Sequence, residues 1–308
     1  MKNTIRKIQE AASGRATLRG LLLIAFVIAA FESALAQYPA ELTPENAARL
    51  KRQIDSGSSE EKRSALLDIR NLQSPTASAI AVPALQDTDV LVRSTAASSV
   101  VYLPKADAAR VLLPLLNDRD EFVRREAAHA LGDVGDESAT SALVRVMERD
   151  KVLEVRSSAA LALGKIGDVN AVENLLKILR SKPSEDFEFL RRNAARSIGQ
   201  IAQIVVAGER AVVTPQNYLP EKFRDFGRAG MNAPPGFSSA VDGLIAVLRN
   251  ASEADDTRRE AAFALGAIGD TRAISALQAQ ASSADPYMVE IVREALLKIE
   301  RRNKPAGT

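Results

Sequence analysis

Apolar residues recur every three or four positions over most of the chain, which is the spacing of one buried face on an α-helix. In residues 123–136 this face consists of Val123, Ala127, Ala130, Leu131 and Val134. We expect Gly132 and Gly135 to end this helix, because glycine adopts left-handed backbone angles at little cost, and Asp136 to cap the next helix. A second, shorter helix is predicted to bury Ala139, Leu143, Val146 and Met147.

This pair of helices recurs along the chain. Residues 123–136 read VRREAAHALGDVGD, residues 155–168 read VRSSAALALGKIGD, and residues 257–270 read TRREAAFALGAIGD. The arginine near the start of each copy, weaker copies included, stands at Arg93, Arg124, Arg156, Arg191 and Arg258. One such pair cannot bury its own apolar face, so the units must stack. The pattern predicts an all-α, right-handed superhelical solenoid of antiparallel helix pairs, with about seven units.

The units resemble the HEAT-repeat superfamily, and in particular the short units called phycobilisome-lyase HEAT-like repeats. The resemblance spans roughly residues 58–300 and is specific for the fold, whereas repeat folds host many unrelated activities. A deoxyhypusine hydroxylase of this repeat type holds two irons with His-Glu pairs. The matching positions here are Arg125-Glu126, Ser157-Ser158, Arg192-Asn193 and Arg259-Glu260. None of them is a histidine, so we do not expect that activity.

The composition excludes further kinds of site. The 308 residues include no Cys, hence no thiolate nucleophile and no Cys-ligated metal, and a single His, hence no site with several imidazoles. That residue, His129, is expected to face solvent, because it lies about 150° from the buried face of its helix. We predict no catalytic residue, no metal and no cofactor, and we do not expect an enzyme.

The first 36 residues have the three parts of a secretory signal peptide: a positive start, an apolar run over residues 21–31, and a small-x-small triplet that ends at Ala36. The run is shorter than the roughly 20 residues that cross a membrane. We therefore expect cleavage after Ala36, not a retained anchor, and a periplasmic or extracellular protein that is free of the membrane. Removing this segment changes the formal charge from +2 to −1, so the basic excess belongs to the signal.

The remaining chain divides into a capping helix over 37–56, the solenoid over 57–302 and a disordered tail over 303–308. A long loop over 203–237 is predicted to interrupt one unit. Disordered linkers are poor in aromatic residues, whereas this loop is rich in them, so we expect it to be ordered by itself or by a partner. Its candidate partner-binding residues are Tyr218, Phe223, Arg224 and Phe226. Packing of the loop against the array is the alternative.

The second helices of the units are expected to line a concave face. Their predicted outward positions include Arg145, Leu176 and Lys177, a mixture of basic and apolar residues that favours a protein or peptide over nucleic acid. The leading hypothesis is an exported, non-catalytic interaction scaffold that uses this face and the loop. The alternative is an enzyme accessory or a lyase-type cofactor chaperone such as a bilin carrier. The oligomeric state stays open.

Acidic residues recur in a fixed relation to the repeated arginines. Asp87, Asp118 and Asp150 each stand six residues before one of them, and Glu185 stands in the same relation to Arg191. We expect an acid in each loop between units and an arginine in the next helix to form a structural ladder of hydrogen-bonded pairs. The arginines of that ladder are Arg93, Arg124, Arg156, Arg191 and Arg258. The alternative is an anion-binding stripe, but the matched acids leave little net positive field.

Overall fold

The computed structural model describes residues 42–207 and 236–303. The predicted signal segment, Tyr218, Phe223, Arg224 and Phe226 lie outside the described residues, as do residues 304–308 of the predicted tail. The α-helices are α3 (Pro44–Ser56), α4 (Ser59–Leu72), α5 (Pro75–Ala81), α6 (Val90–Ser99), α7 (Lys105–Leu112), α8 (Glu121–Val134), α9 (Thr140–Arg149), α10 (Leu153–Ile166), α11 (Val172–Arg180), α12 (Glu188–Ala207), α13 (Ser238–Arg249), α14 (Asp255–Ile268), α15 (Ile274–Gln278) and α16 (Pro286–Asn303).

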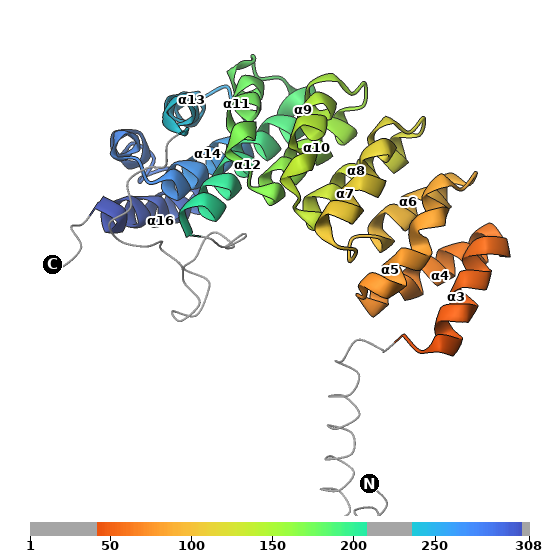
Figure 1. The fold of residues 1–308 in the computed structure, drawn as a ribbon. Helices are drawn as coiled ribbons and strands as arrows, with labels where there is room; N and C mark the ends of the chain where they lie inside the picture. The colour runs from red at the N-terminus through yellow and green to blue at the C-terminus, as the bar shows by residue number, and fades with distance from the viewer. Residues whose placement is uncertain (1–41, 208–235, 304–308) are drawn as a thin grey trace, which may run out of the picture.

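The helices stack in two layers to form an arched solenoid, with α3 and α16 at its two ends (Figure 1). We call the layer of α4, α6, α8, α10, α12, α14 and α16 the A layer, and each of its members packs on the next. We call the exposed surface of α5, α7, α9, α11, α13 and α15 the B face. The predicted all-α solenoid of helix pairs is therefore confirmed.

Short 3-10 turns extend or introduce the B helices. Turns η1 (Val82–Gln86) and η2 (Leu113–Asn117) follow α5 and α7. Turns η3 (Glu137–Ala139), η4 (Val169–Ala171) and η8 (Thr271–Ala273) precede α9, α11 and α15, and η5 (Glu185–Phe187) precedes α12. The B helices are consequently shorter than most of their A partners.

The second glycine of the repeated motif ends each of three A helices. Gly135, Gly167 and Gly269 are C-caps with φ of 65°, 85° and 80°, the left-handed region that glycine adopts at little cost. The aspartate that follows caps the next turn, as when the Asp136 carboxylate accepts a hydrogen bond from the Ser138 amide at 2.9 Å. At the N-terminal end of the array, the Thr43 hydroxyl caps α3 by accepting a hydrogen bond from the Asn46 amide.

The first glycine of the motif has a different role, so the prediction that Gly132 ends its helix is wrong. Gly132 lies inside α8 and faces α10, and a Cβ there would lie 2.8 Å from the Cα of Ala162. The equivalent Gly164, Gly199 and Gly266 face Ser197, Ala264 and Ala295 of the next A helix in the same way. Each of these glycines lets two A-helix backbones approach closely.

Small side chains complete this close contact. The hydroxyl of Ser197 in α12 donates to the Ala160 carbonyl in α10 at 2.8 Å, and Ser99 in α6 donates to Leu66 in α4 at 2.9 Å. The core around them consists almost entirely of Ala, Leu, Val and Ile. An aliphatic core suffices because helices separated only by Ala and Gly leave little volume to fill.

Three predicted boundaries differ from the structure. Helix α12 continues to Ala207, so residues 203–207 are helical and do not belong to a loop. Phe237 also lies in the core, directly before α13. Helix α16 includes Asn303, the first residue of the predicted tail, whose side chain donates to the Gly269 carbonyl at 3.2 Å. Within the described ranges, none of the helices has the length and apolar character that a membrane crossing requires.

The A-layer contact makes a stability prediction. We expect Gly132→Ala to lower the free energy of unfolding by about 1–2 kcal/mol, because overpacking against a backbone outweighs the better helix propensity of alanine. Gly243→Ala in α13 is the comparison, since its new methyl group would meet the side chain of the buried Leu176 and not a backbone. Chemical denaturation of both variants tests this, and equal or higher stability of Gly132→Ala would contradict it.

Candidate functional site

The repeated arginines and aspartates form a ladder that joins neighbouring units. The Arg93 guanidinium donates to the Asp118 carboxylate through Nε at 2.9 Å and Nη2 at 3.0 Å. Arg124 binds Asp150 in the same bidentate way, at 2.7 and 3.0 Å. The third nitrogen of each arginine donates to the backbone carbonyl of the aspartate six residues before it. The carboxylate of each aspartate thus pairs with the arginine of the preceding unit. The arginine six residues after the aspartate binds only its backbone carbonyl, so the predicted carboxylate pairing within this relation is wrong.

Away from the middle of the array, the equivalent arginines and acids bind other partners. Asp87 binds Lys62, and Arg156 donates to the Met147 carbonyl at 2.7 Å with its guanidinium over the ring of Phe187. Arg191 is bound by Glu253 of the following unit, so the expected relation with Glu185 is not formed. Arg258 contacts Asp255 and Gln280, while the neighbouring Arg259 pairs with Asp285 at 2.6 Å.

The ion pairs in the middle of the ladder are buried, which indicates that they stabilise the fold. The side chains of Arg124 and Asp150 are each 8% exposed. Burial by itself would raise the pKa of Asp150, but hydrogen bonds from Arg124 and from the Val152 amide lower that pKa below its ordinary value. The same balance lowers the pKa of Asp118. With their donors occupied, Arg93 and Arg124 do not form the anion-binding stripe that was the alternative.

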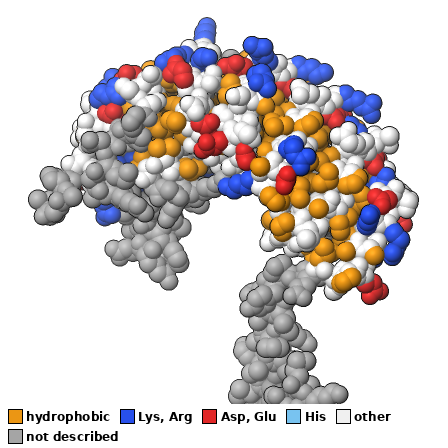
Figure 2. All heavy atoms as spheres, viewed as in Figure 1, with side chains coloured by type: hydrophobic (Ala, Val, Ile, Leu, Met, Phe, Trp, Pro, Cys, Tyr) orange, Lys and Arg blue, Asp and Glu red, His pale blue; other side chains and the backbone are white. Residues whose placement is uncertain are grey.

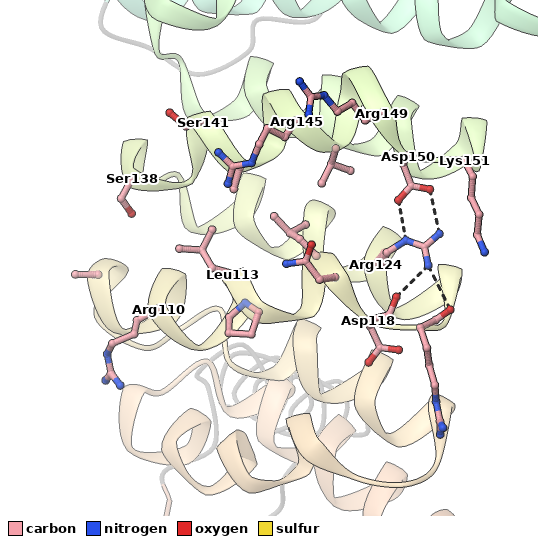
Figure 3. A pocket seen from close by; sticks show the side chains of 17 residues that line it. Arg110, Leu113, Asp118, Arg124, Ser138, Ser141, Arg145, Arg149, Asp150 and Lys151 are labelled. Atoms are coloured by element: carbon pink, nitrogen blue, oxygen red, sulfur yellow. Dashed lines mark hydrogen bonds and ion pairs between the residues drawn. The ribbon is translucent and has the colours of Figure 1, made fainter.

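Beside the ladder lies a groove of about 1130 Å³ on the B face, between α7 with η2 and η3 with α9. Its apolar part includes Leu113, Pro114, Ala142 and Val146. Figure 3 shows Arg110 and Arg145 on either side of Leu113, with the Arg124–Asp150 pair at the other end. Ser138 and Ser141 add exposed hydroxyl groups.

The groove is rich in positive charge. Its basic lining residues are Arg110, Arg119, Arg124, Arg145, Arg149 and Lys151, and its acidic ones are Asp118 and Asp150. Both acids already bind ladder arginines. On the face seen in Figure 2, hydrophobic side chains gather over the N-terminal units, with acidic and basic side chains around them. The remaining basic side chains therefore give the groove a net positive charge.

The structure separates the predicted partner-binding residues on the B face. Arg145 lines the groove, and Lys177 is exposed on α11, where its ammonium lies 3.7 Å from the Glu148 carboxylate. The prediction that Leu176 points outward is wrong, because Leu176 is fully buried. Its side chain fills the space over Gly243 of α13, which has no side chain of its own to occupy that space.

The A helices carry an exposed row of apolar residues that was not predicted from the sequence. The second residue of four A helices is a large, exposed apolar one: Leu91, Phe122, Phe189 and Tyr287. Three of them have an arginine stacked over the ring, namely Arg125, Arg192 and Arg259. This row could have been predicted from the sequence, because Leu91, Phe122 and Tyr287 each stand two residues after a capping aspartate.

His129 lies on the surface of α8, with its side chain 56% exposed. Its Nδ1 lies 3.2 Å from the Asp133 carboxylate, which also accepts from Lys165 at 2.7 Å. Partial burial opposes ionisation of Asp133, but these two partners lower its pKa to about 2. In the part of the chain that the structure describes, no three His, Cys, Asp or Glu side chains are grouped so that they could hold a metal ion.

The fold and the repeated loops define a helical-repeat solenoid. Comparisons with known proteins identify the family of these repeats. A HEAT-repeat model matches residues 46–131, 79–164 and 109–198, and the PBS lyase HEAT-like repeat matches residues 257–282. Together these matches span more than half of the chain, and the protein belongs to the HEAT-repeat family. A search of curated proteins finds no match.

One solved structure shows the same fold at low identity, and others align with lower TM-scores. An engineered protein aligns with a TM-score of 0.50 and 20% identity over 82% of this chain and 68% of its own. The complex of CpcE and CpcF of phycocyanin lyase from Nostoc sp. aligns with a TM-score of 0.44 and 21% identity, over 85% and 90%. Human deoxyhypusine hydroxylase aligns with a TM-score of 0.38 and 22% identity, over 83% and 96%. At these identities the likeness concerns the fold alone.

The ladder predicts a loss of stability in acid. Asp118 and Asp150 have a lower pKa folded than unfolded, so their pairs contribute fully above the unfolded value of 3.8 and are lost as the pH falls through the folded values. We expect Asp150→Asn to cost about 3 kcal/mol at neutral pH, because it leaves Arg124 buried with a weaker partner. The difference from the wild type should shrink below pH 3.8, as acid protonates the native carboxylate.

Asp242→Asn is the control, since Asp242 pairs with Arg272 while 69% exposed. Exposed pairs contribute about 0–1 kcal/mol. Denaturant unfolding over a range of pH measures both variants. Equal costs for Asp150→Asn and Asp242→Asn, or a cost for Asp150→Asn that does not depend on pH, would contradict a structural role for the ladder.

Proposed function

We propose that the protein is an exported, non-catalytic scaffold that binds a protein or peptide partner through the B face and the segment between α12 and α13, residues 208–236. The observation that carries this proposal is the groove between α7 and α9. It combines an apolar floor with charged and hydroxyl side chains that reach solvent, which is the mixture found at protein-binding surfaces. The solenoid supports it, because stacked repeats present extended surfaces to their partners.

A second function, a cofactor chaperone or enzyme accessory, is favoured by one observation, the match of residues 257–282 to the PBS lyase HEAT-like repeat. The two functions differ in what the purified protein carries. A chaperone for a bilin or similar chromophore retains visible absorbance or takes up added chromophore in proportion to protein. A scaffold for a protein does neither, so an absorbance titration separates the two functions.

Site-specific photocrosslinking tests the scaffold. Ser141 and Ser275 occupy the same place in the repeated Ser-Ala-Leu sequence of two B helices, and both are exposed. Only Ser141 lines the groove. We expect a photoreactive residue at 141, introduced in the cell of origin, to crosslink a discrete partner, whereas the same residue at 275 gives little product. Equal crosslinking at both positions, or none at 141, would contradict partner binding in the groove.

Export makes a separate prediction. We expect the mature protein to begin at Gln37 and to be found outside the cytoplasm, because the signal ends with a small-x-small triplet at Ala36. N-terminal sequencing of the protein purified from its own cells, together with cell fractionation, measures this. Ala34→Lys with Ala36→Lys should block cleavage, whereas Ser33→Ala is the neutral control. A mature protein that begins at residue 1 or 2 would refute the proposed cleavage.

A further inference from the structure

Four of the six basic side chains that line the B-face groove form no ion pair within the described residues. Arg145 and Arg149 stand four residues apart in α9, on one side of the helix, and both are exposed. Neither makes an ion pair with a residue in the described ranges, and the same holds for Arg119 and Lys151. Like charges at this spacing destabilise a helix. Arg145 and Arg149 have no carboxylate partner among the described residues, which leaves both guanidinium groups available to an anionic ligand.

The two acids in the groove cannot provide that charge. The Asp118 carboxylate is held by Arg93 and the Asp150 carboxylate by Arg124, each through two hydrogen bonds. The ladder arginines therefore neutralise both acidic side chains of the groove. The other basic side chains of the groove face solvent. Guanidinium groups prefer carboxylates, which they bind through two parallel hydrogen bonds.

Apolar side chains decide what kind of anion fits. Leu113 and Val146 are half-buried, and Ala142 and Pro114 continue the same floor. Resting on the proposed function, we propose that the groove binds an acidic peptide segment, whose Asp or Glu side chains reach Arg145 and Arg149 while apolar side chains between them pack on Leu113 and Val146. The occupant is thus a peptide in which carboxylates lie beside an apolar segment.

Nucleic acid fits the groove less well. Single strands are held by aromatic side chains on which the bases stack, and no aromatic residue lines this groove. Duplexes need a basic surface that follows the backbone for some distance. The B face next to the groove instead carries acids, among them Asp107, Glu148 and Glu173.

Selection from a library tests the proposal without a known partner. The full mature chain is used to select from random displayed peptides, and the same selection is made with the double variant Arg145→Glu, Arg149→Glu. The matched control is Arg249→Glu, because Arg249 also ends a B helix and is exposed but lies outside the groove. We expect the wild type and the control to select net acidic peptides that contain apolar residues.

Affinities of the selected peptides then measure the role of the two arginines. We expect the double variant to bind a selected acidic peptide at least about tenfold more weakly than the wild type, with Arg145→Gln in between. Added salt should weaken wild-type binding more than binding by the variant. Thermal unfolding shows whether the variants keep the wild-type fold, and Arg145→Gln provides the comparison if the double variant does not.

Four outcomes would overturn the proposal, and each leads to a different conclusion about the groove. Selection of basic or neutral peptides that bind the groove overturns the acidic ligand but leaves the scaffold function. Selected acidic peptides whose affinity is the same in the double variant place the ligand elsewhere. A single-stranded oligonucleotide that binds as tightly as the peptide, with the same loss in the variant, assigns the groove to nucleic acid. Failure to select any peptide, together with no crosslink at position 141, removes the scaffold function as well.

Discussion

The close approach of successive A helices at glycine is the constraint on which the rest of the array depends. Gly132, Gly164, Gly199 and Gly266 each face the backbone or a small side chain of the next A helix, and there is no room for a Cβ. This spacing brings the loop of one unit next to the loop of the following unit. At the contact of α8 with α10, this spacing lets Arg124 reach the carboxylate of Asp150 in the next repeat.

The ladder couples this architecture to the surface of the B face. Asp118, Arg124 and Asp150 are structural, yet all three line the groove, and they form one end of it (Figure 3). Because each aspartate is neutralised by the arginine of the preceding unit, other basic residues of the same loops and helices, such as Arg119 and Arg149, remain without a carboxylate there. One set of pairs thereby holds the units together and gives the groove its positive charge.

Much of the fold could be predicted because it follows from local rules. Gly135 and Gly167 end their helices, Asp136 caps the next turn, and the aliphatic spacing defines the buried face of α8. In α9 it correctly predicts Leu143 and Met147 as buried, whereas Val146 is half-buried and lines the groove. The errors concern positions where a neighbouring unit decides. Gly132 looks like a helix terminator in sequence but is a contact between helices, and Leu176 looks exposed by helical angle but fills a space left by Gly243.

The sequence by itself determined that the chain is a stack of helix pairs, because a fixed period, a capping aspartate and a terminating glycine are local properties of each repeat. It also showed that a multi-histidine or cysteine site is impossible, since the side chains are missing. The tertiary structure alone decided which arginine pairs with which aspartate, because both candidate partners lie in equivalent loops and only the stacking distance selects between them. It likewise decided where charge is left over, since a cation on the B face is free or neutralised according to the unit that packs beside it.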